Sequence, residues 1–264
     1  MPARASHHST ISHNGFCTAK VPTTGFVFRC LAVMCFVLWV ISGTSIEPAR
    51  ADHGPRTWSA SHKSVLVVAP TWPGYARPGF GAPSGVAPEG SGIVYPIGSS
   101  DGSYILTAAH VVAEAEKIEI ILADGTRHEA ELHALDMRRD IAVLHAKPRL
   151  STITLADSIP AVGEHVCALV NAFGLGVSFT CGVTSATARQ NIGFNEIEDF
   201  IQTDAAINPG ASGGALVRAD GALVGMVSAI FTKEADIDAG VNFAVSLSLI
   251  EQSLLEMRNN GVTF

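Results

Sequence analysis

The sequence has few charged residues. Asp, Glu, Lys and Arg make up only 16% of its 264 residues, whereas hydrophobic residues make up 47%. Coiled coils and disordered chains carry a much larger charged fraction, so the composition argues against both classes. The 25 glycines are typical of a compact, turn-rich globular protein, and the length suffices for one large domain or two small ones.

Acidic residues are missing before Glu47, and this part of the chain has the character of an export signal. Basic residues precede the apolar run 30–41, and Ala49–Ala51 has the small-x-small pattern of a signal-peptidase site. Twelve apolar residues are few for a helix that spans a bilayer. We predict that residues 1–51 are an export segment and that the mature protein is periplasmic or secreted, without stable membrane association. An uncleaved membrane anchor is the alternative.

Basic tracts are missing too. Without residues 1–51, the chain keeps 13 basic and 23 acidic side chains, a formal charge of −10. A negative surface of this kind repels a phosphate backbone, so we predict no nucleic-acid partner.

Cysteine is scarce: three of the five cysteines lie in residues 1–51, which leaves Cys167 and Cys181. The two lie equally far from Gly174, so a hairpin through that glycine would place them opposite each other. In an exported chain this predicts a disulfide, with two separate buried thiols as the alternative. The spacing does not fit a zinc site, and no histidine follows His165. We predict no metal and no cofactor.

Long helical patterns are also rare. Residues 52–87 read as an irregular N-terminal segment with one strand or short helix, and residues 88–264 as one domain of short strands joined by hairpin-type turns. Only the end of the chain predicts a helix, with Ser248 as its N-cap and Gly261 as its stop. The fold class is therefore all-β, of the barrel type, with a C-terminal helix.

The turn Ile207–Leu216 holds a serine among glycines. Pro209 fixes one backbone angle, and glycines on both sides of Ser212 free its hydroxyl and let backbone N–H groups converge. A serine nucleophile with an oxyanion hole needs both features. No histidine follows Ser212, which excludes the Ser–acid–His order of α/β-hydrolases.

The general base must therefore lie upstream. His110 ends an apolar strand pattern, which would hold it on a rigid base, unlike the other histidines. Asp140 comes directly before another apolar strand, where an imidazole N–H would satisfy its carboxylate. Asp136, four residues earlier, is the competing carboxylate.

Three motifs, Thr107–Val112, Asp140–Leu144 and Thr203–Gly214, resemble those of trypsin/chymotrypsin-fold serine proteases, and more narrowly of the HtrA/Deg branch. The resemblance covers about residues 88–250. It implies two six-stranded β-barrels, about 88–155 and 160–250, with the active site in the cleft between them. It also implies that Ser212 is the nucleophile, His110 the general base and Asp140 its partner, acting on polypeptide substrates through an acyl-enzyme. The backbone N–H groups of Gly210 and Ser212 would form the oxyanion hole.

Ala211 departs from this family, which usually has Asn or Asp before the nucleophile. The change raises the question whether the oxyanion loop keeps its active geometry. A protease-fold binding protein with an incompetent loop is therefore one alternative to an endopeptidase. An esterase on the same barrels is another. Because the chain ends after the predicted helix, we expect no PDZ domain.

The resemblance places the substrate pocket around Ala206, Val227, Ser228 and Ala229. None of these is acidic, which favours small or medium aliphatic side chains over Lys or Arg at the cleavage site. The sequence yields no oligomeric state, although relatives of this branch are often trimers.

Overall fold

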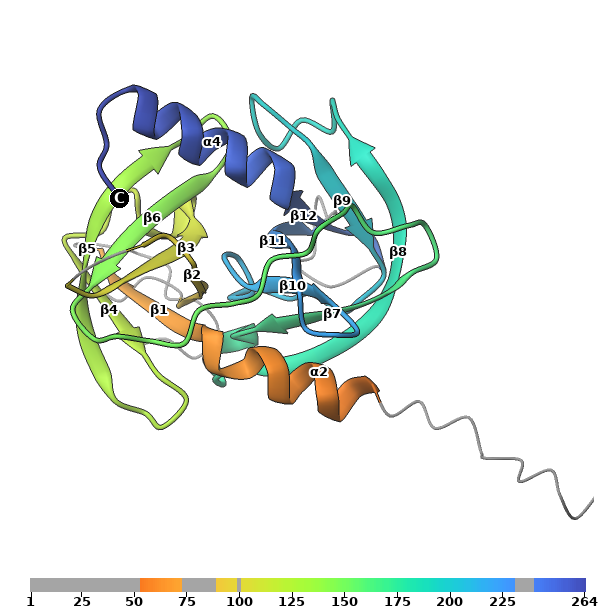
Figure 1. Ribbon diagram of the computed structural model, residues 1–264, viewed down its shortest axis with the longest axis horizontal. Helices are drawn as coiled ribbons and strands as arrows, with labels where there is room; N and C mark the ends of the chain where they lie inside the picture. The colour runs from red at the N-terminus through yellow and green to blue at the C-terminus, as the bar shows by residue number, and fades with distance from the viewer. Residues whose placement is uncertain (1–52, 73–88, 99–100, 231–239) are drawn as a thin grey trace, which may run out of the picture. The chain divides into compact units, whose positions relative to one another are not determined.

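The computed structural model describes residues 53–72, 89–98, 101–230 and 240–264. They form two closed six-stranded barrels, in which every strand pair is antiparallel (Figure 1). This is the all-β, two-barrel architecture that the sequence predicts. The apolar run 30–41 and the rest of the predicted export segment lie outside the described residues. None of the helices that are described is long and apolar enough to cross a membrane.

The first barrel has the strand order β1-β2-β3-β6-β5-β4. Its strands are β1 (Val65–Thr71), β2 (Gly90–Tyr95), β3 (Ser103–Ala108), β4 (Lys117–Ile121), β5 (Arg127–Asp136) and β6 (Ile141–Ala146). Alternate residues of β1, Leu66 and Val68, belong to an apolar cluster of this barrel alone, as the two-residue period of a strand requires. β1 comes from the segment 52–87, so the barrel takes one strand from the part of the sequence that looked irregular.

The second barrel has the strand order β10-β11-β12-β9-β8-β7. Its strands are β7 (His165–Val170), β8 (Ser178–Arg189), β9 (Phe200–Thr203), β10 (Ala215–Arg218), β11 (Leu223–Ile230) and β12 (Asn242–Ser246). A large apolar cluster joins the two barrels, with Ile93, Leu106 and Ile141 on one side and Leu169 and Met226 on the other. This shared core fixes the edge at which the two barrels meet.

The predicted disulfide is confirmed. Cys167 on β7 faces Cys181 on β8 in the strand register, and their sulfurs are bonded. The hairpin passes through η2 (Ala172–Gly174), where Gly174 has a positive φ of 71°. Two cysteines equally far from the turn therefore lie directly opposite each other.

The C-terminal helix is α4 (Leu247–Asn259), which extends from the second barrel across the first (Figure 1). The prediction that Ser248 caps it was wrong: Ser246 is the N-cap, and its side chain accepts the N–H of Leu249 at 3.1 Å. The helix begins two residues earlier than its spacing suggested, because β12 leads straight into it. Its end is as predicted, since Gly261 has φ +95° and the N–H of Val262 reaches back to Met257.

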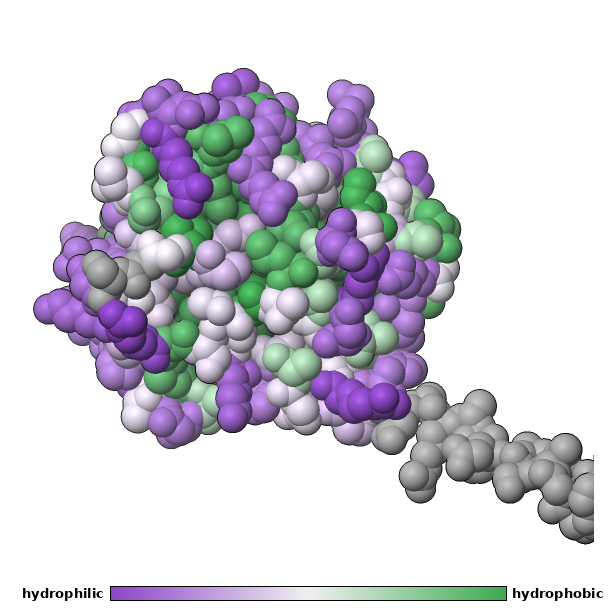
Figure 2. All heavy atoms as spheres, in the orientation of Figure 1, coloured by the Kyte–Doolittle hydropathy of each residue, from purple (hydrophilic) through white to green (hydrophobic). Residues whose placement is uncertain are grey.

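Two further helices lie at the barrel edges. α2 (His53–Ser61) continues through η1 (His62–Ser64) into β1, and α3 (Ala109–Val112) directly follows β3. α2 contacts the second barrel, because the hydroxyl of Thr57 donates to the carbonyl of Ala219 at 2.5 Å. Polar side chains cover much of the face shown in Figure 2, with apolar ones gathered near its middle.

Candidate active site

His110 and Asp140 meet at one end of the first barrel. His110 lies in α3, just past β3, and Asp140 directly precedes β6, the neighbour of β3. The ring Nδ1 of His110 lies 2.8 Å from Asp140 Oδ2 and 3.0 Å from Oδ1. Because both side chains stand at the ends of paired strands, the sheet fixes their separation. The second ring nitrogen, Nε2, remains for another partner, and about half of the His110 side chain is exposed.

Several donors hydrogen-bond to Asp140. Its carboxylate also accepts the backbone N–H of His110 at 2.9 Å and the hydroxyl of Ser228 at 2.9 Å. Its carbonyl accepts the N–H of Ala109 at 3.2 Å. The residue has a φ of +58°, a left-handed conformation that Asp tolerates better than most residues. A buried carboxylate needs this many donors, and they fix the oxygen that faces the imidazole.

Asp136, the competing carboxylate, lies elsewhere. It pairs with the buried Arg139 at 2.8 Å and accepts the hydroxyl of Ser253 in α4 at 2.7 Å. Burial opposes ionisation, but the hydrogen bonds from Arg139 and Ser253 hold the pKa of Asp136 below its ordinary value. Arg139 also binds Glu256 of α4, so this network fastens the helix to the turn that precedes Asp140.

Ser212 lies on the second barrel, in the turn before β10, and Ser228 connects it to Asp140. The hydroxyl of Ser212 donates to the carbonyl of Ser228 at 3.3 Å, and the Ser228 hydroxyl donates to Asp140. In the described part of the chain, no hydrogen bond joins Ser212 to His110. The two barrels thus bring all three predicted residues to one place, with the serine hydroxyl held by a single long bond.

The carbonyl groups of the turn from Asn208 to Ser212 are all hydrogen-bonded. The following bonds satisfy them: Ala211 N–H to Asn208 at 3.0 Å, Phe173 N–H to Pro209 at 2.7 Å, Ser91 hydroxyl to Gly210 at 2.9 Å, Gly214 N–H to Ala211 at 2.9 Å, and Ser91 N–H to Ser212 at 2.8 Å. The orientation of each peptide plane in the turn is therefore determined by a partner.

The N–H groups of the same turn divide into two kinds. Ala211, Gly213 and Gly214 donate to carbonyls of the protein. Those of Gly210 and Ser212 have no acceptor among the residues that the structure describes. Because a peptide plane points its N–H opposite to its carbonyl, the bond from Phe173 to Pro209 turns the Gly210 N–H away from Phe173. Two free donors on either side of one residue, next to a serine hydroxyl, can bind a negative oxygen.

The four residues predicted to line the substrate pocket differ in what their side chains contact. Ala206 is half-buried, and its carbonyl accepts the hydroxyl of Thr180. Val227 is fully buried in an apolar cluster of the second barrel, and it touches the serine turn through its backbone. The side chain of Ser228 is engaged by Asp140. The side chain of Ala229 lies outside the described residues, although its backbone pairs with Phe243.

Comparison with known families identifies the fold. The family model of the trypsin-like peptidase domain matches residues 90–226, slightly more than half of the chain. The chain belongs to the trypsin-like peptidase family. The match includes all three residues of the candidate site, which the two barrels of this peptidase domain hold at their junction.

Curated relatives of this trypsin-like peptidase are periplasmic endoproteases. The chain is 39% identical over 175 residues to a probable periplasmic serine endoprotease, DegP-like, of Buchnera aphidicola subsp. Baizongia pistaciae. It is 37% identical over 175 residues to the periplasmic serine endoprotease DegP of Escherichia coli K12. Each match takes in 65% of this chain but only 37% and 36% of the relatives, so the chain spans little more than a third of their length.

Solved structures show the same likeness. The HtrA-type protease AlgW with a tripeptide has a TM-score of 0.68 and 36% identity, over 79% of this chain and 64% of that one. The serine endoprotease from Yersinia pestis has a TM-score of 0.63 and 31% identity, over 79% and 67%. The resemblance inferred from three motifs is thereby confirmed at the level of family and fold.

For two residues of the site in this peptidase domain, the sequence did not predict the contacts that the structure shows. Ser228 was predicted to line the substrate pocket, but its hydroxyl binds Asp140. Ser91 lies on β2, some 120 residues before the turn that it contacts, in the short sequence Gly90–Gly92. Neither has a local pattern that marks it, because each acts through partners from distant parts of the chain.

A metal-ligand geometry occurs at one place in the described residues. Potential ligand atoms of His165, Cys167 and Cys181 lie within 4.8 Å of one another. The Nε2 atom of His165 also lies 3.1 Å from Nε2 of His53. The disulfide occupies both sulfurs, so they do not offer thiolates to an ion. Burial, and then the neighbouring His53, lower the pKa of His165, which favours its neutral form.

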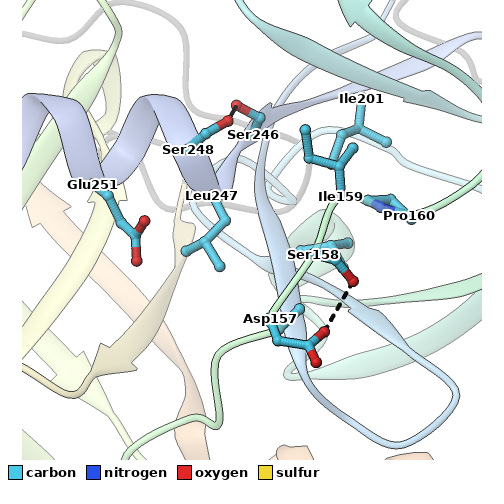
Figure 3. A pocket seen from close by; sticks show the side chains of 11 residues that line it. Asp157, Ser158, Ile159, Pro160, Ile201, Ser246, Leu247, Ser248 and Glu251 are labelled. Atoms are coloured by element: carbon cyan, nitrogen blue, oxygen red, sulfur yellow. Dashed lines mark hydrogen bonds between the residues drawn. The ribbon is translucent and has the colours of Figure 1, made fainter.

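A small hollow lies between the segment 156–160 and the start of α4 (Figure 3). Ile159, Ile201 and Leu247 form its apolar wall, with Asp157 and Glu251 at its rim. Its volume of about 160 Å³ is below the range of ordinary small-molecule sites. None of the residues that line it belongs to the candidate active site.

Proposed function

We propose that this chain is an exported serine endopeptidase in which Ser212, His110 and Asp140 form the catalytic triad. The observation that carries the proposal is the position of Ser228, which hydrogen-bonds Asp140 with its hydroxyl and Ser212 with its carbonyl. Because Ser228 bonds both residues, Ser212 lies close to the His110–Asp140 pair. The family and the endoprotease relatives support the same activity.

The chemistry begins at the Ser212 hydroxyl. The long hydrogen bond to Ser228 restrains it weakly, so the hydroxyl is available to give its proton to His110 Nε2. The imidazole takes the proton as Ser212 Oγ forms a bond to the substrate carbonyl carbon. Asp140 accepts the Nδ1–H, which fixes the tautomer and stabilises the imidazolium. His110 then returns the proton to the leaving amine, and water hydrolyses the acyl-enzyme in the same way.

The N–H groups of Gly210 and Ser212 are the proposed oxyanion hole. Whether these N–H groups are correctly oriented depends on how the turn is held, because the side chain of Ala211 lies in the apolar core and offers no hydrogen bond. The carbonyls of the turn are nevertheless all bonded, two of them by Ser91 and one by Phe173. These contacts support a competent loop, and they argue against a binding protein with an incompetent one.

Polypeptides are the proposed substrates, because relatives are named endoproteases and solved relatives carry a tripeptide or a decapeptide. The periplasmic relatives and the disulfide support an exported location, since disulfides persist in oxidising compartments. Small or medium aliphatic residues at the cleavage site, lodged near Ala206, remain the prediction for specificity.

The test is covalent labelling of the purified mature chain, residues 52–264, with a fluorophosphonate probe. We expect wild type to label and Ser212→Ala to remain unlabelled, while Ser158→Ala, a matched serine away from the site, labels like wild type. Circular dichroism verifies folding of each variant. Absence of labelling in a folded wild type refutes the endopeptidase and favours the binding protein. Labelling together with hydrolysis of esters but not of unfolded casein supports the esterase instead.

A further inference from the structure

Ser91 is a buried residue of the first barrel that contacts the serine turn of the second. Its side chain is fully shielded from solvent in β2. Its hydroxyl donates to the carbonyl of Gly210 at 2.9 Å and accepts the N–H of Asn171 at 2.8 Å. Its own N–H donates to the carbonyl of Ser212 at 2.8 Å, and its carbonyl accepts the hydroxyl of Thr107. Each polar group of Ser91 therefore has a partner.

The two carbonyls that Ser91 binds stand on either side of Ala211. The peptide between Gly210 and Ala211 separates the two peptides that carry the free N–H groups. Its orientation therefore sets the angle between those N–H groups. Among the described residues, no other bond holds the Gly210 carbonyl, and the buried side chain of Ala211 provides none. The N–H of the same peptide, on Ala211, donates to the carbonyl of Asn208 at 3.0 Å, which is a bond within the turn itself, so the Ser91 hydroxyl is what ties this peptide to the other barrel.

Removing the Ser91 hydroxyl would leave a carbonyl without its partner. The Gly210 carbonyl is half-buried, and rotation of the peptide would let it find another donor. Glycine resists such rotation less than any other residue, and Gly210 already lies at φ +93°. The rotation would misalign the N–H groups of Gly210 and Ser212 relative to a developing oxyanion.

We propose that Ser91 is a positioning residue that aligns the oxyanion-hole N–H groups from the opposite barrel. The proposal rests on the serine endopeptidase function given above. Ser91 is shielded from solvent and does not touch substrate, so it acts through the backbone of the turn. Its hydroxyl thus supplies a hydrogen bond to the turn, whereas the apolar side chain of Ala211 supplies none.

The kinetic test compares Ser91→Ala with Ser91→Thr, which keeps the hydroxyl, and with Ser103→Ala. Ser103 is a matched control, because it is a buried serine of the first barrel whose side chain bonds the N–H of Leu150. We expect Ser91→Ala to lower the rate of fluorophosphonate labelling about 10- to 100-fold, less than the loss of a donor itself. Ser103→Ala should stay within about twofold and Ser91→Thr within about fivefold of wild type.

With a quenched fluorescent casein, Ser91→Ala should lower kcat while KM changes less than about twofold, because the oxyanion forms only in the transition state. If folded Ser91→Ala labels as fast as wild type, the positioning role is refuted. Equal losses in Ser91→Ala and Ser103→Ala would also refute it, since they would indicate a general effect of buried hydroxyls.

Hydrogen exchange provides a readout that does not require activity. In the Ser212→Ala background, adding Ser91→Ala should speed exchange of the Ala211 N–H at least about tenfold, because the turn loses its fastening. Amides of β6 should not change. Unchanged exchange at Ala211 overturns the proposal even if wild type shows no labelling, whereas failure of labelling alone overturns only the endopeptidase function.

Discussion

Two turns of the second barrel bring several backbone N–H groups together. In one turn these groups are all bonded to a carboxylate, and in the other two of them have no acceptor among the described residues. In the loop before β9, the carboxylate of Glu198 accepts four N–H groups, those of residues 192–195, at 2.6–3.1 Å. In the serine turn, the N–H groups of Gly210 and Ser212 have no acceptor among the described residues. The first cluster is filled by the chain itself, and we propose that the second is filled by substrate.

The difference lies in what holds each turn in shape. The Glu198 loop is held in shape by the same carboxylate that accepts its N–H groups, so none of those four donors is left for a ligand. Burial opposes ionisation of Glu198, but the four N–H donors keep the pKa of its carboxyl below the ordinary value. The serine turn is shaped through its carbonyls, which leaves donors free before any substrate arrives. Preorganised donors of this kind favour the transition state because they need no rearrangement during the reaction.

The largest effect is expected from Gly210→Ala. Gly210 has φ +93°, and a Cβ there would lie 2.4 Å from the carbonyl oxygen of Asn171, so the turn must move. We expect kcat/KM to fall about 10²- to 10³-fold, as when one oxyanion donor is lost. Kinetics with quenched casein measure it.

Gly193→Ala is the matched control for that change. Gly193 has φ +94° in the Glu198 loop, but a Cβ there meets open space. It should cost about 1–2 kcal/mol of stability from the positive φ alone and leave kcat/KM within about threefold. Similar losses of activity in both variants would mean that the free donors of the serine turn have no special role.

A smaller effect is expected from emptying the filled cluster. Glu198→Ala removes the acceptor of four N–H groups that water can partly replace, so we expect a loss of about 1–2 kcal/mol in the free energy of unfolding. Glu198→Gln, which keeps one acceptor oxygen, should lie in between. Urea denaturation measures both. A loss of activity beyond about threefold would contradict the separation of the two turns.

The smallest effect is a dependence of stability on pH. The pKa values of Glu198 and Asp136 are lowered by folding from ordinary values of 4.5 and 3.8. Their stabilisation is therefore full above the ordinary values and is lost as pH falls through the lower folded pKa values. Each carboxyl adds at most about 1.4 kcal/mol per pH unit to the slope. Urea denaturation between pH 2.5 and 6 should show a shallower decline for Glu198→Ala; an identical decline would contradict the assignment.

Local patterns in the sequence predicted the all-β barrel class, the disulfide and the candidate site residues, whereas the division into two six-stranded barrels came from the resemblance of three motifs. Ser212 stands among glycines, and His110 and Asp140 stand where apolar strands end. Cys167 and Cys181 lie symmetrically about a glycine turn. The helix cap was missed by two residues because the chain passes from β12 into α4 without a loop. The apolar run of β1 was predicted as one strand or short helix, but the proline-rich sequence around it hid that it belongs to the first barrel.

The sequence by itself determined which side chains are available for the chemistry and the order in which they occur along the chain. Only the tertiary structure decided which groups hold the serine turn in a chain that has no polar side chain at position 211. These contacts come from Ser91 on the other barrel and from the backbone of Phe173. No pattern of neighbouring residues encodes them, because a backbone N–H or a buried hydroxyl acquires its partner only when the two barrels close on each other.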